Sequence, residues 1–477
     1  MAQDEFTYID IGAIDSAAGR VAKPKRIAVS DAPSRARQAV RQGDVLFSTV
    51  RPYLRAIALT PPLTAAVAST GFCVLRAATG IDPRFLFYWV RSEAFIAQVL
   101  PLQRGSSYPA VRDQDVLDRS IPVPPSAQQR VIADRLDELF SGLDTAVAEL
   151  QAAQAKLIQY RQSLLKAAVQ GDLTAEWRAE NPPQETGAEL LVRIVRERRA
   201  RWEARQLERY ATQGKSPPKE WQSKYAESAP PDTARLSELP PEWTYASLGQ
   251  CFEVAVGATP SRKAADYWNG EVPWVSSGEV QFNRISATRE TITRLGLDNS
   301  STQLNPIGSV FLGMIGEGRT RGQVAILDIE AANNQNCAAI WVSQTDVPTE
   351  FIYCWLWSRY DETRRGSSGN NQPALNKSLV QAMPTPLPPA PEAREIVERI
   401  STQLAAIERQ ERDIEHLFRM AAAQRQNILR TAFTGQLVPQ DPNDEPASAL
   451  LARIRAARVG ASDKPQTRRA RQAKLTA

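Results

Sequence analysis

One segment of the chain occurs twice, and this duplication limits the fold more than any other feature of the sequence. Residues 122–173 align without a gap to residues 386–437, at an offset of 264. Twelve of the 52 aligned positions are identical, whereas unrelated sequences of ordinary composition would agree at roughly 6% of positions, or about three. The sequence therefore predicts one module built twice. The identical residues of the first copy are Pro122, Pro124, Pro125, Arg130, Ile132, Arg135, Arg161, Gln162, Leu165, Ala168, Gly171 and Leu173.

Each copy has the pattern of a long helix. Prolines precede it, and Gly171 and Gly435 stand where a helix end favours glycine. Between them apolar residues recur every seven positions, the period of a coiled coil. We expect two helices of about 43 residues, roughly 65 Å long, packed antiparallel. Two unrelated helices on separate domains remain the alternative, because both seams are partly polar. The predicted seam residues are Leu136, Leu143, Leu150, Leu157, Leu164, Ile400, Ile407, Ile414 and Ile428.

The rest of the chain is divided by these helices. Short apolar runs separated by Gly, Asn, Asp and Ser predict strands at residues 45–47, 72–75, 310–312, 323–327 and 338–342. The predicted fold class is α+β, with two mixed α/β heads joined by the helix pair in a pseudo-two-fold arrangement. The expected order is a first head (1–121), a first helix (122–173), a connector with an Arg-rich helix and a linker (174–238), a second head (239–385), a second helix (386–437) and a basic tail (438–477).

Charge is unevenly placed along the chain. The net charge is +5, but the segment 453–477 holds eight Lys and Arg against one acid, so residues 1–452 sum to −2. Any polyanion would therefore be bound by local clusters and this tail, not by a basic coat; a solvated tail without a ligand is the alternative. The four scattered cysteines predict free thiols in a reducing cytoplasm. The sequence has no run of eighteen apolar residues and no secretory pattern at its start.

Catalytic motifs are missing from the sequence. The single histidine, His416, falls in the second long helix, and no P-loop pattern occurs. The run Gly313, Gly316, Gly318 and Gly322 lacks a strand–GxGxxG–helix frame, so we interpret it as a loop. The segment 181–184 resembles the Asn-Pro-Pro-aromatic loop of amino-methyltransferases, but it carries Gln in the aromatic position and is interpreted as a linker turn. The sequence predicts no catalytic or metal site.

Binding residues gather instead in the loops of both heads. Arg donates paired hydrogen bonds to guanine, and Asn or Gln pairs in the same way with adenine. Each residue alone is more often a solvated loop residue, so the grouping carries the prediction. In the first head the candidates are Arg35, Arg37, Arg51, Tyr53, Arg55, Arg104, Ser106, Ser107, Tyr108 and Arg112. In the second head they are Arg262, Lys263, Tyr267, Trp268, Arg319, Arg321, Asn333, Asn334, Gln335, Asn336, Ser367, Ser368, Asn370, Asn371 and Gln372.

These segments resemble the target recognition domains of DNA specificity subunits of type I restriction-modification enzymes. The Pro-Pro start and the Arg-Gln-x-[Ile/Leu]-Leu end of each long helix are similar to the spacer of that family. The second head supplies Leu239-Pro240-Pro241-Glu242-Trp243, Ser247-Leu248-Gly249, Gly257-Ala258-Thr259-Pro260-Ser261, Tyr267-Trp268-Asn269-Gly270, Val272-Pro273-Trp274-Val275, Gly308 and Asn334-Gln335. The first head supplies Gly43-Asp44-Val45-Leu46-Phe47-Ser48, Arg51-Pro52-Tyr53-Leu54 and Ser69-Thr70-Gly71-Phe72.

The resemblance implies a non-catalytic subunit that reads a split target in double-stranded DNA. Each head would read one half-site in the major groove, and the helices would set the spacing between half-sites. The chain would hold two methyltransferase (modification) subunits, joined by restriction or motor subunits. S-adenosylmethionine, ATP and Mg are expected on those partners, and this chain would bind no cofactor. A coiled-coil scaffold with protein-binding heads is the second hypothesis, and a self-contained nuclease or methyltransferase is the third.

The first head departs from the family pattern at its start. In the 264-residue register, Trp243 has no counterpart, because that position falls before residue 1. We therefore expect the first head to lack its opening segment and the Gly-Thr-Pro type of loop. This leaves the reading of a half-target by the first head open. We expect in-frame coding sequence upstream to supply such an opening.

Overall fold

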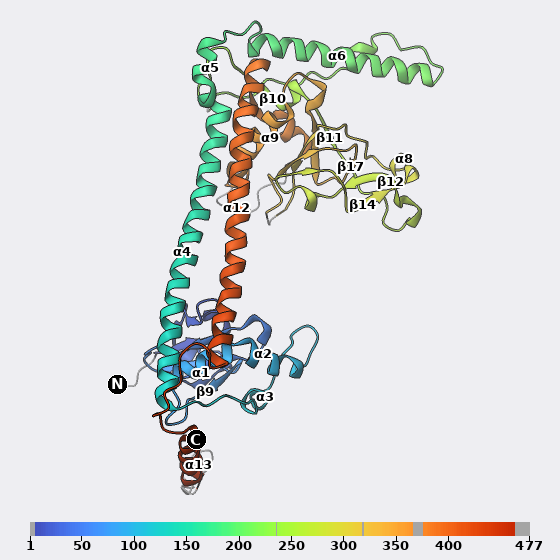
Figure 1. The fold of residues 1–477 in the computed structure, drawn as a ribbon. Coiled ribbons are helices and arrows are strands. Elements are labelled where there is room, and N and C mark those ends of the chain that lie inside the picture. Colours follow the sequence, from blue (N-terminus) through green and yellow to red (C-terminus); the bar gives the residue numbers. More distant parts are fainter. Residues whose placement is uncertain (1–4, 235, 317–318, 366–374, 463–477) are drawn as a thin grey trace. The chain divides into compact units, whose positions relative to one another are not determined.

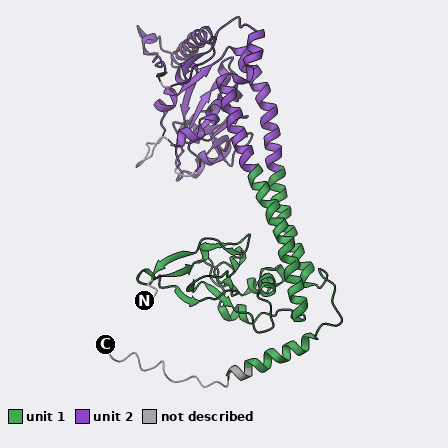
Figure 2. Ribbon diagram, turned by 90° about the vertical axis from the view of Figure 1, so that its left-hand side faces the viewer, with its two compact units in different colours: residues 1–153, 413–477 green, residues 154–412 purple. Residues whose placement is uncertain are grey.

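The two long helices connect two compact units. The computed structural model describes residues 5–234, 236–316, 319–365 and 375–462. Unit 1 comprises Met1–Ala153 and Asp413–Ala477, and unit 2 comprises Gln154–Arg412. Figure 2 shows the two units in different colours. The chain passes from one unit to the other within each long helix. No helix in the described part of the chain is both long and apolar enough to cross a membrane.

The long helices are α4 (Ser126–Gln170) and α12 (Ala390–Phe433). Both begin just after prolines, and both are followed by a glycine with positive φ, 79° at Gly171 and 76° at Gly435. Within unit 2 they run antiparallel, since residues late in α4 contact residues early in α12. Tyr160 donates to Gln403 Oε1 at 2.8 Å, and Arg399 Nη1 donates to the Leu173 carbonyl at 2.8 Å. The predicted α+β fold with two long antiparallel helices is confirmed.

The predicted seam residues face inward to different degrees. Leu136, Leu164, Ile400, Ile407 and Ile414 are buried. The remaining four seam residues are half-buried. In unit 1, Leu136, Leu143 and Ile428 pack with the first head, and in unit 2 Leu164, Ile400 and Ile407 belong to the core of the second head. Each helix half is therefore part of the core of its own unit. The half-buried seam residues are Leu143, Leu150, Leu157 and Ile428.

The described residues of the first head form two sheets and three short α-helices. Phe47, Phe85, Trp89 and Phe95 form its core with α4 and the end of α12. One sheet has the order β4 (Lys25–Ala28), β1 (Glu5–Ile9), β8 (Ala66–Ser69), β5 (Ala36–Ala39). The other has the order β2 (Ile14–Asp15), β3 (Arg20–Val21), β7 (Ile57–Leu59), β6 (Val45–Ser48), β9 (Phe72–Leu75). The helices are α1 (Pro83–Arg91), α2 (Glu93–Val99) and α3 (Asp113–Leu117), and α13 (Ala447–Ser462) follows α12.

The second head is built in the same way with more strands. A five-stranded sheet has the order β11 (Glu253–Val256), β18 (Cys337–Trp341), β15 (Val310–Gly313), β16 (Val324–Leu327), β13 (Asn283–Ile285). A smaller sheet has the order β14 (Glu290–Ile292), β12 (Trp268–Val275), β17 (Ala332–Asn333). Another consists of the pair β10 (Thr244–Ser247) and β19 (Pro384–Leu387). The helices are α7 (Leu248–Cys251), α8 (Arg294–Asp298), α9 (Thr349–Ser358), α10 (Tyr360–Arg365) and α11 (Lys377–Ala382). The connector forms α5 (Ala175–Glu180) and α6 (Gly187–Thr212).

The duplication extends into the sheets of the heads. In the first head β6 pairs with β9 so that Val45 lies opposite Leu75. In the second head β15 pairs with β18 so that Val310 lies opposite Ile340. Val310 and Ile340 each stand 265 positions after their counterparts Val45 and Leu75, so the strand register is the same in the two heads. The five strands predicted from apolar runs correspond to β6, β9, β15, β16 and β18.

Candidate nucleic-acid interface

Two loops that follow strands of the second head are joined directly. Gly257 follows β11, and a Cβ atom there would overlap the Asn333 carbonyl oxygen, so only glycine allows this approach. Two residues later, Thr259 Oγ1 donates to Gln335 Oε1 at 2.7 Å. Gln335 is exposed in the turn before β18. The Gly-Ala-Thr-Pro-Ser segment and the Asn-Gln turn therefore form one polar surface.

Asn333 does not belong to that surface. It is fully buried, its amide nitrogen donates to the Asn334 and Cys337 carbonyls at 2.9 Å, and its Oδ1 accepts from Asn305 at 2.9 Å. Asn334 is also buried, and its Oδ1 accepts from the Asn336 amide at 3.1 Å. Both side chains shape the turn from inside, and their burial and hydrogen bonds leave neither free to contact a base, contrary to the prediction. Asn336 is half-buried beside them.

A third loop, between β15 and β16, lies next to this turn. The Met314 amide donates to the Asn336 carbonyl at 2.8 Å, which joins the start of the loop to the Asn-Gln turn. Arg319 is exposed, and its carbonyl accepts from Tyr360 Oη at 2.8 Å. Arg321 is half-buried, and its Nε has no hydrogen-bond partner among the described residues. The predicted residues Ser367, Ser368, Asn370, Asn371 and Gln372 lie outside the described residues.

Arg262 is held by neighbouring side chains. Its guanidinium lies 3.6 Å from the centroid of the Trp268 ring and pairs with Glu290, with Nη2 to Oε2 at 2.9 Å. The hydrogen bond from Arg262 holds the pKa of the Glu290 carboxyl below its ordinary value. An arginine stacked and paired in this way braces the start of β12. Of its predicted neighbours, Lys263 is exposed and Tyr267 is half-buried.

In the first head, Arg51 brings together two predicted loops. It has a left-handed backbone, with φ of 49°, and its amide donates to the Pro109 carbonyl at 2.7 Å. Its guanidinium lies 4.9 Å from the centroid of the Tyr108 ring, and its Nη2 donates to the Ser107 carbonyl at 3.4 Å. Tyr108 is 72% exposed although its ring is large and apolar. Arg51 Nε has no hydrogen-bond partner among the described residues.

Three other predicted arginines of the first head pair with acids of that head. Arg112 and Arg104 flank Asp115, with N–O distances of 3.1 and 3.8 Å, and the hydrogen bond from Arg112 lowers the pKa of Asp115. Arg55 pairs with Glu93. Ser106 and Tyr53 are exposed, and they stand two positions from Arg104 and Arg55 in the sequence.

Two more arginines lie at the start of β5. The Arg35 carbonyl accepts from the Thr70 amide at 2.9 Å, and Arg37 Nε donates to the Ser34 carbonyl at 2.7 Å. Both are exposed. Because the carbonyl of Gly71 in turn accepts from the Thr49 amide, this segment connects through the backbone to the Arg51 loop.

Several supporting residues were not predicted as part of the site. Glu290 and Asp115 are acids, and nothing in their local sequence marks them as partners of Arg262 and Arg112. Gly257 and Thr259 do carry a signal, because they belong to the Gly-Ala-Thr-Pro-Ser run already noted as a motif. Thr259, a polar residue two positions after this required glycine, could therefore have been predicted as part of the site. In the described residues, no group of three or more His, Cys, Asp or Glu is placed to hold a metal.

The arrangement defines a class of protein with two related heads, each presenting a different set of Arg, amide and aromatic side chains on loops that follow sheet strands. The model of the family described as type I restriction modification DNA specificity domain matches residues 40–152 and 240–416. The chain belongs to this family and carries its domain twice.

Individual relatives cover most of the chain. The EcoDI specificity subunit of a type I restriction enzyme from Escherichia coli is 23% identical over 400 residues, covering 82% of this chain and 80% of its own. The HindI specificity subunit of a type I restriction enzyme from Haemophilus influenzae is 23% identical over 354 residues, which cover 69% of this chain and 72% of the HindI subunit. A solved chain of a type I restriction-modification system, from work on its complex assembly and conformational transition, is 25% identical with a TM-score of 0.64. The match covers 91% of this chain and 92% of the solved chain.

Proposed function

We propose that this chain is the sequence-specific DNA-binding subunit of a type I restriction-modification enzyme and reads a target in two halves. The observation that carries the proposal is the duplicated head with unlike loop surfaces. In the loops after the corresponding strands β6 and β15, the first head presents Arg51 and the second presents Arg319. Tyr108 beside Arg51, and the bonded pair Thr259 and Gln335 in the second head, make the two surfaces more unlike. A split target with two different half-sites requires unlike readers on a common frame.

One arginine in each head favours a ligand at these surfaces. Arg51 Nε and Arg321 Nε are enclosed, and neither has a hydrogen-bond partner among the described residues. Each of these side chains brings a positive charge to its loop that is only partly compensated within the described residues, which favours an anionic ligand near it. Together with the exposed Arg319 and the exposed Tyr108 ring, these charges support contact with nucleic acid over contact with a neutral partner.

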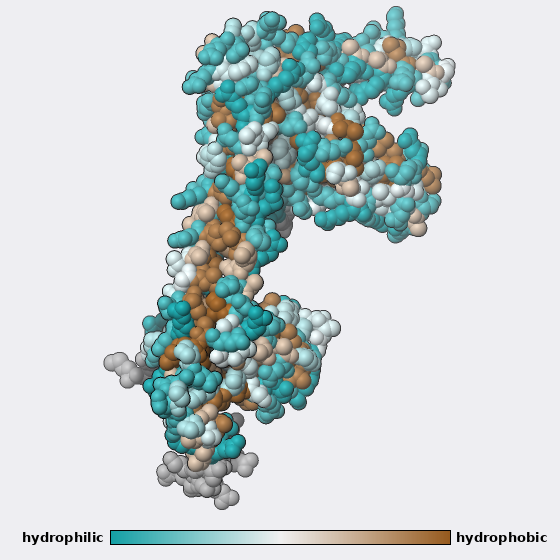
Figure 3. Space-filling model, viewed as in Figure 1, coloured by the Kyte–Doolittle hydropathy of each residue, from teal (hydrophilic) through white to brown (hydrophobic). Residues whose placement is uncertain are grey.

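The helix pair supports partner binding. In unit 1 a groove of about 900 Å³ lies between α4, α12 and the first head, and its walls combine apolar residues such as Phe140, Val147 and Phe418 with charged residues such as Asp144 and Arg425. Figure 3 shows apolar surface exposed along the helices. We infer that methyltransferase subunits bind such helix surfaces, two to each chain, and that restriction or motor subunits join them. S-adenosylmethionine, ATP and Mg then belong to the partners, this chain is non-catalytic, and the complex works in the cytoplasm.

The test is a gel shift of the chain together with its methyltransferase subunits. The duplex is chosen from the positions methylated in the DNA of cells that carry the system. We expect this duplex to bind far more tightly than a random duplex of equal length at the same salt concentration. Equal binding of both duplexes would contradict the proposal.

Single substitutions separate the two heads. Arg319→Ala and Gln335→Ala should each lose discrimination at one half-site, costing about 1–3 kcal/mol per base contact. Arg51→Ala is the matched control and should affect the other half-site. An equal loss of affinity for all DNA sequences would show that these residues contact phosphates and not bases.

A further inference from the structure

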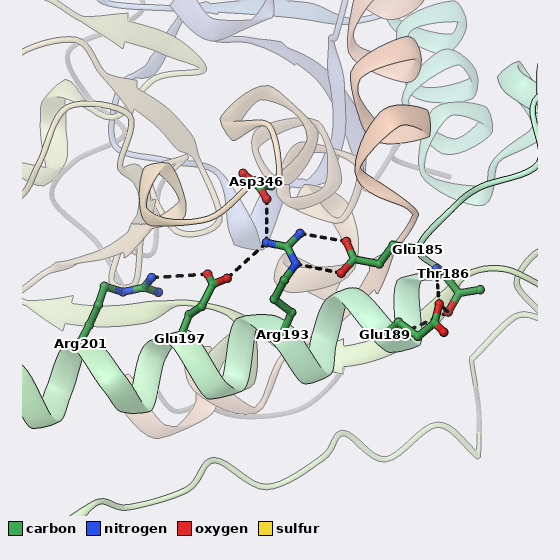
Figure 4. Close-up of polar contacts among 7 residues, drawn as sticks. All are labelled: Glu185, Thr186, Glu189, Arg193, Glu197, Arg201 and Asp346. Atoms are coloured by element: carbon green, nitrogen blue, oxygen red, sulfur yellow. Dashed lines mark hydrogen bonds and ion pairs between the residues drawn. The ribbon is translucent and has the colours of Figure 1, made fainter.

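The helix that follows each long helix is also duplicated. At an offset of 260 residues, α6 and α13 share a Leu-Leu pair, an Arg-Ile pair and a further Arg, and a Glu stands two residues before each helix. In α6, Arg193 Nε pairs with Glu185 Oε1 at 2.8 Å, and in α13, Arg453 Nη2 pairs with Glu445 Oε2 at 2.7 Å. Figure 4 shows the α6 contact, in which Arg193 also reaches Asp346 and Glu197. The same ion pair fixes the start of both helices. The repeated residues are Glu185, Leu190, Leu191, Arg193, Ile194 and Arg198 in the first copy and Glu445, Leu450, Leu451, Arg453, Ile454 and Arg458 in the second.

In unit 2 the space between α6 and the head is filled by residues 244–256. Their first strand, β10, pairs with β19, and their last strand, β11, pairs with β18 at the edge of the five-stranded sheet. The intervening turn, α7, packs on α11 and on α6, with Leu248 and Cys251 fully buried. Arg198 of α6 donates to the Gly249 carbonyl and, at 2.8 Å, to the Gln250 carbonyl. An arginine on α6 thus satisfies the carbonyl end of this turn.

In unit 1 the elements that correspond to these partners are uncovered. Residues 120–123 correspond to β19, but no described strand pairs with them. β9 corresponds to β18 and is an edge strand, since β6 is its only partner among the described strands. Leu117 of α3 stands where Gln381 of α11 contacts α7, and it is 57% exposed. Arg458 is exposed at the position of Arg198.

Between these elements lies an apolar groove of about 360 Å³. Its apolar lining includes Val74 and Leu75 of β9, Leu117, Ile121, Val123, and Leu451 and Ile454 of α13, and four arginines also line it: Arg76, Arg119, Arg455 and Arg458. Its walls therefore include the counterparts of β18, β19, Gln381 and Arg198, which residues 244–256 contact in unit 2. A cation at the rim complements the partial negative charge of carbonyl groups at the end of a helical turn.

We propose that this groove binds a strand–turn–strand segment of the same pattern as residues 244–256. Its first strand adds to residues 120–123, and its second strand extends the sheet at β9. The apolar turn between them lies on Leu117 and directs its terminal carbonyls at Arg458. Backbone pairing at a free sheet edge supplies affinity, and the apolar groove supplies selectivity for the turn.

The experiment joins a copy of residues 239–257, with Cys251→Ser, to the amino end of the full chain through a long Gly/Ser linker. Linking keeps the segment at high effective concentration, so weak binding is still detected. The readout is hydrogen exchange of the amides in residues 72–75 and 119–123, resolved by mass spectrometry. We expect at least about tenfold slower exchange at both places than in the unmodified chain.

Two exposed groove positions supply the controls. Leu117→Asp and Arg458→Glu in the extended chain should restore fast exchange, whereas Val131→Asp, an exposed position on α4 outside the groove, should not. Unchanged exchange in the extended chain overturns the proposal, as does equal protection in the Leu117→Asp and Val131→Asp chains. Gel shifts of the same proteins report DNA binding by the second head independently, so the two proposals fail separately.

Discussion

Individual residues in the second head decide whether its loops can meet. Gly257 is needed because the Asn333 carbonyl occupies the space of a side chain, and Asn333 itself is held by Asn305 and by two carbonyls. The exposed Gln335 is therefore carried on a buried amide network.

Gly257→Ala should destabilise unit 2 by about 1–3 kcal/mol, because the added methyl group forces the β17 backbone to move. Urea unfolding followed by tryptophan fluorescence measures the change. Gly142→Ala is the matched control: nothing lies within 4 Å of a Cβ there, and it is exposed within α4. It should stabilise unit 1 by about 1 kcal/mol. A neutral Gly257→Ala would show that the loop has room.

The cysteines should be unreactive in the native chain. Burial raises the pKa of the Cys73, Cys251, Cys337 and Cys354 thiols to about 12. Their contribution to stability is thus full below the unfolded pKa of about 8.5 and is lost as the pH rises toward the folded value. A thiol reagent at pH 8 should react slowly with the native chain and rapidly with all four thiols in denaturant. Fast native labelling would show that a thiol is accessible.

At the scale of elements, one buried carboxylate joins three segments of unit 2. Glu392, in the first turn of α12, accepts from Trp243 Nε1 at 2.8 Å, from Thr174 Oγ1 at 2.7 Å and from Arg178 Nε at 2.9 Å. Its side chain is 2% exposed. The opening of the second head, the connector and α12 are therefore fixed to each other at one point.

Glu392→Ala should destabilise unit 2 by about 3–5 kcal/mol, because it leaves Arg178 enclosed without its carboxylate. Thermal unfolding monitored by circular dichroism would report this. Glu395→Ala is the control one turn on: it removes a partly exposed pair with Arg399 within the helix and should cost about 0.3–0.5 kcal/mol. Equal losses in the two variants would argue against the buried network.

The sequence predicts the elements better than it predicts the contacts. A heptad period and bounding prolines and glycines were enough to predict α4 and α12, since both signals are local. Short apolar runs predicted β6, β9, β15, β16 and β18 for the same reason. The roles of Asn333 and Arg262 could not be predicted, because each depends on a partner 28 residues away, Asn305 and Glu290 respectively. The pattern of Arg and amide residues marks the loops but not which side chains stay free.

On the scale of the whole molecule, the helices are shared between the units. Each of α4 and α12 contributes one half to the core of each unit. A change in helix length therefore leaves both cores intact if it is made where one unit ends and the other begins, after Ala153 and after Arg412.

Inserting one heptad at both of these positions should change the spacer accepted between the half-sites and leave the half-site sequences unchanged. Gel shifts against duplexes that differ only in spacer length measure this. An insertion in α4 alone breaks the pairing of the helices and serves as the control. An unchanged spacer preference would show that the helices do not set the distance.

Unit 1 is assembled from the two ends of the chain, whereas unit 2 is one continuous stretch, and this difference sets an order during synthesis on the ribosome. Unit 2 can close once residue 412 has emerged. The first head, although made earlier, must wait for Leu429, Ala432 and Phe433 to complete its core. A chain that stops at residue 412 should therefore keep unit 2 resistant to trypsin while residues 1–153 are degraded. Of the two heads, the one that is made earlier is, by its topology, finished later.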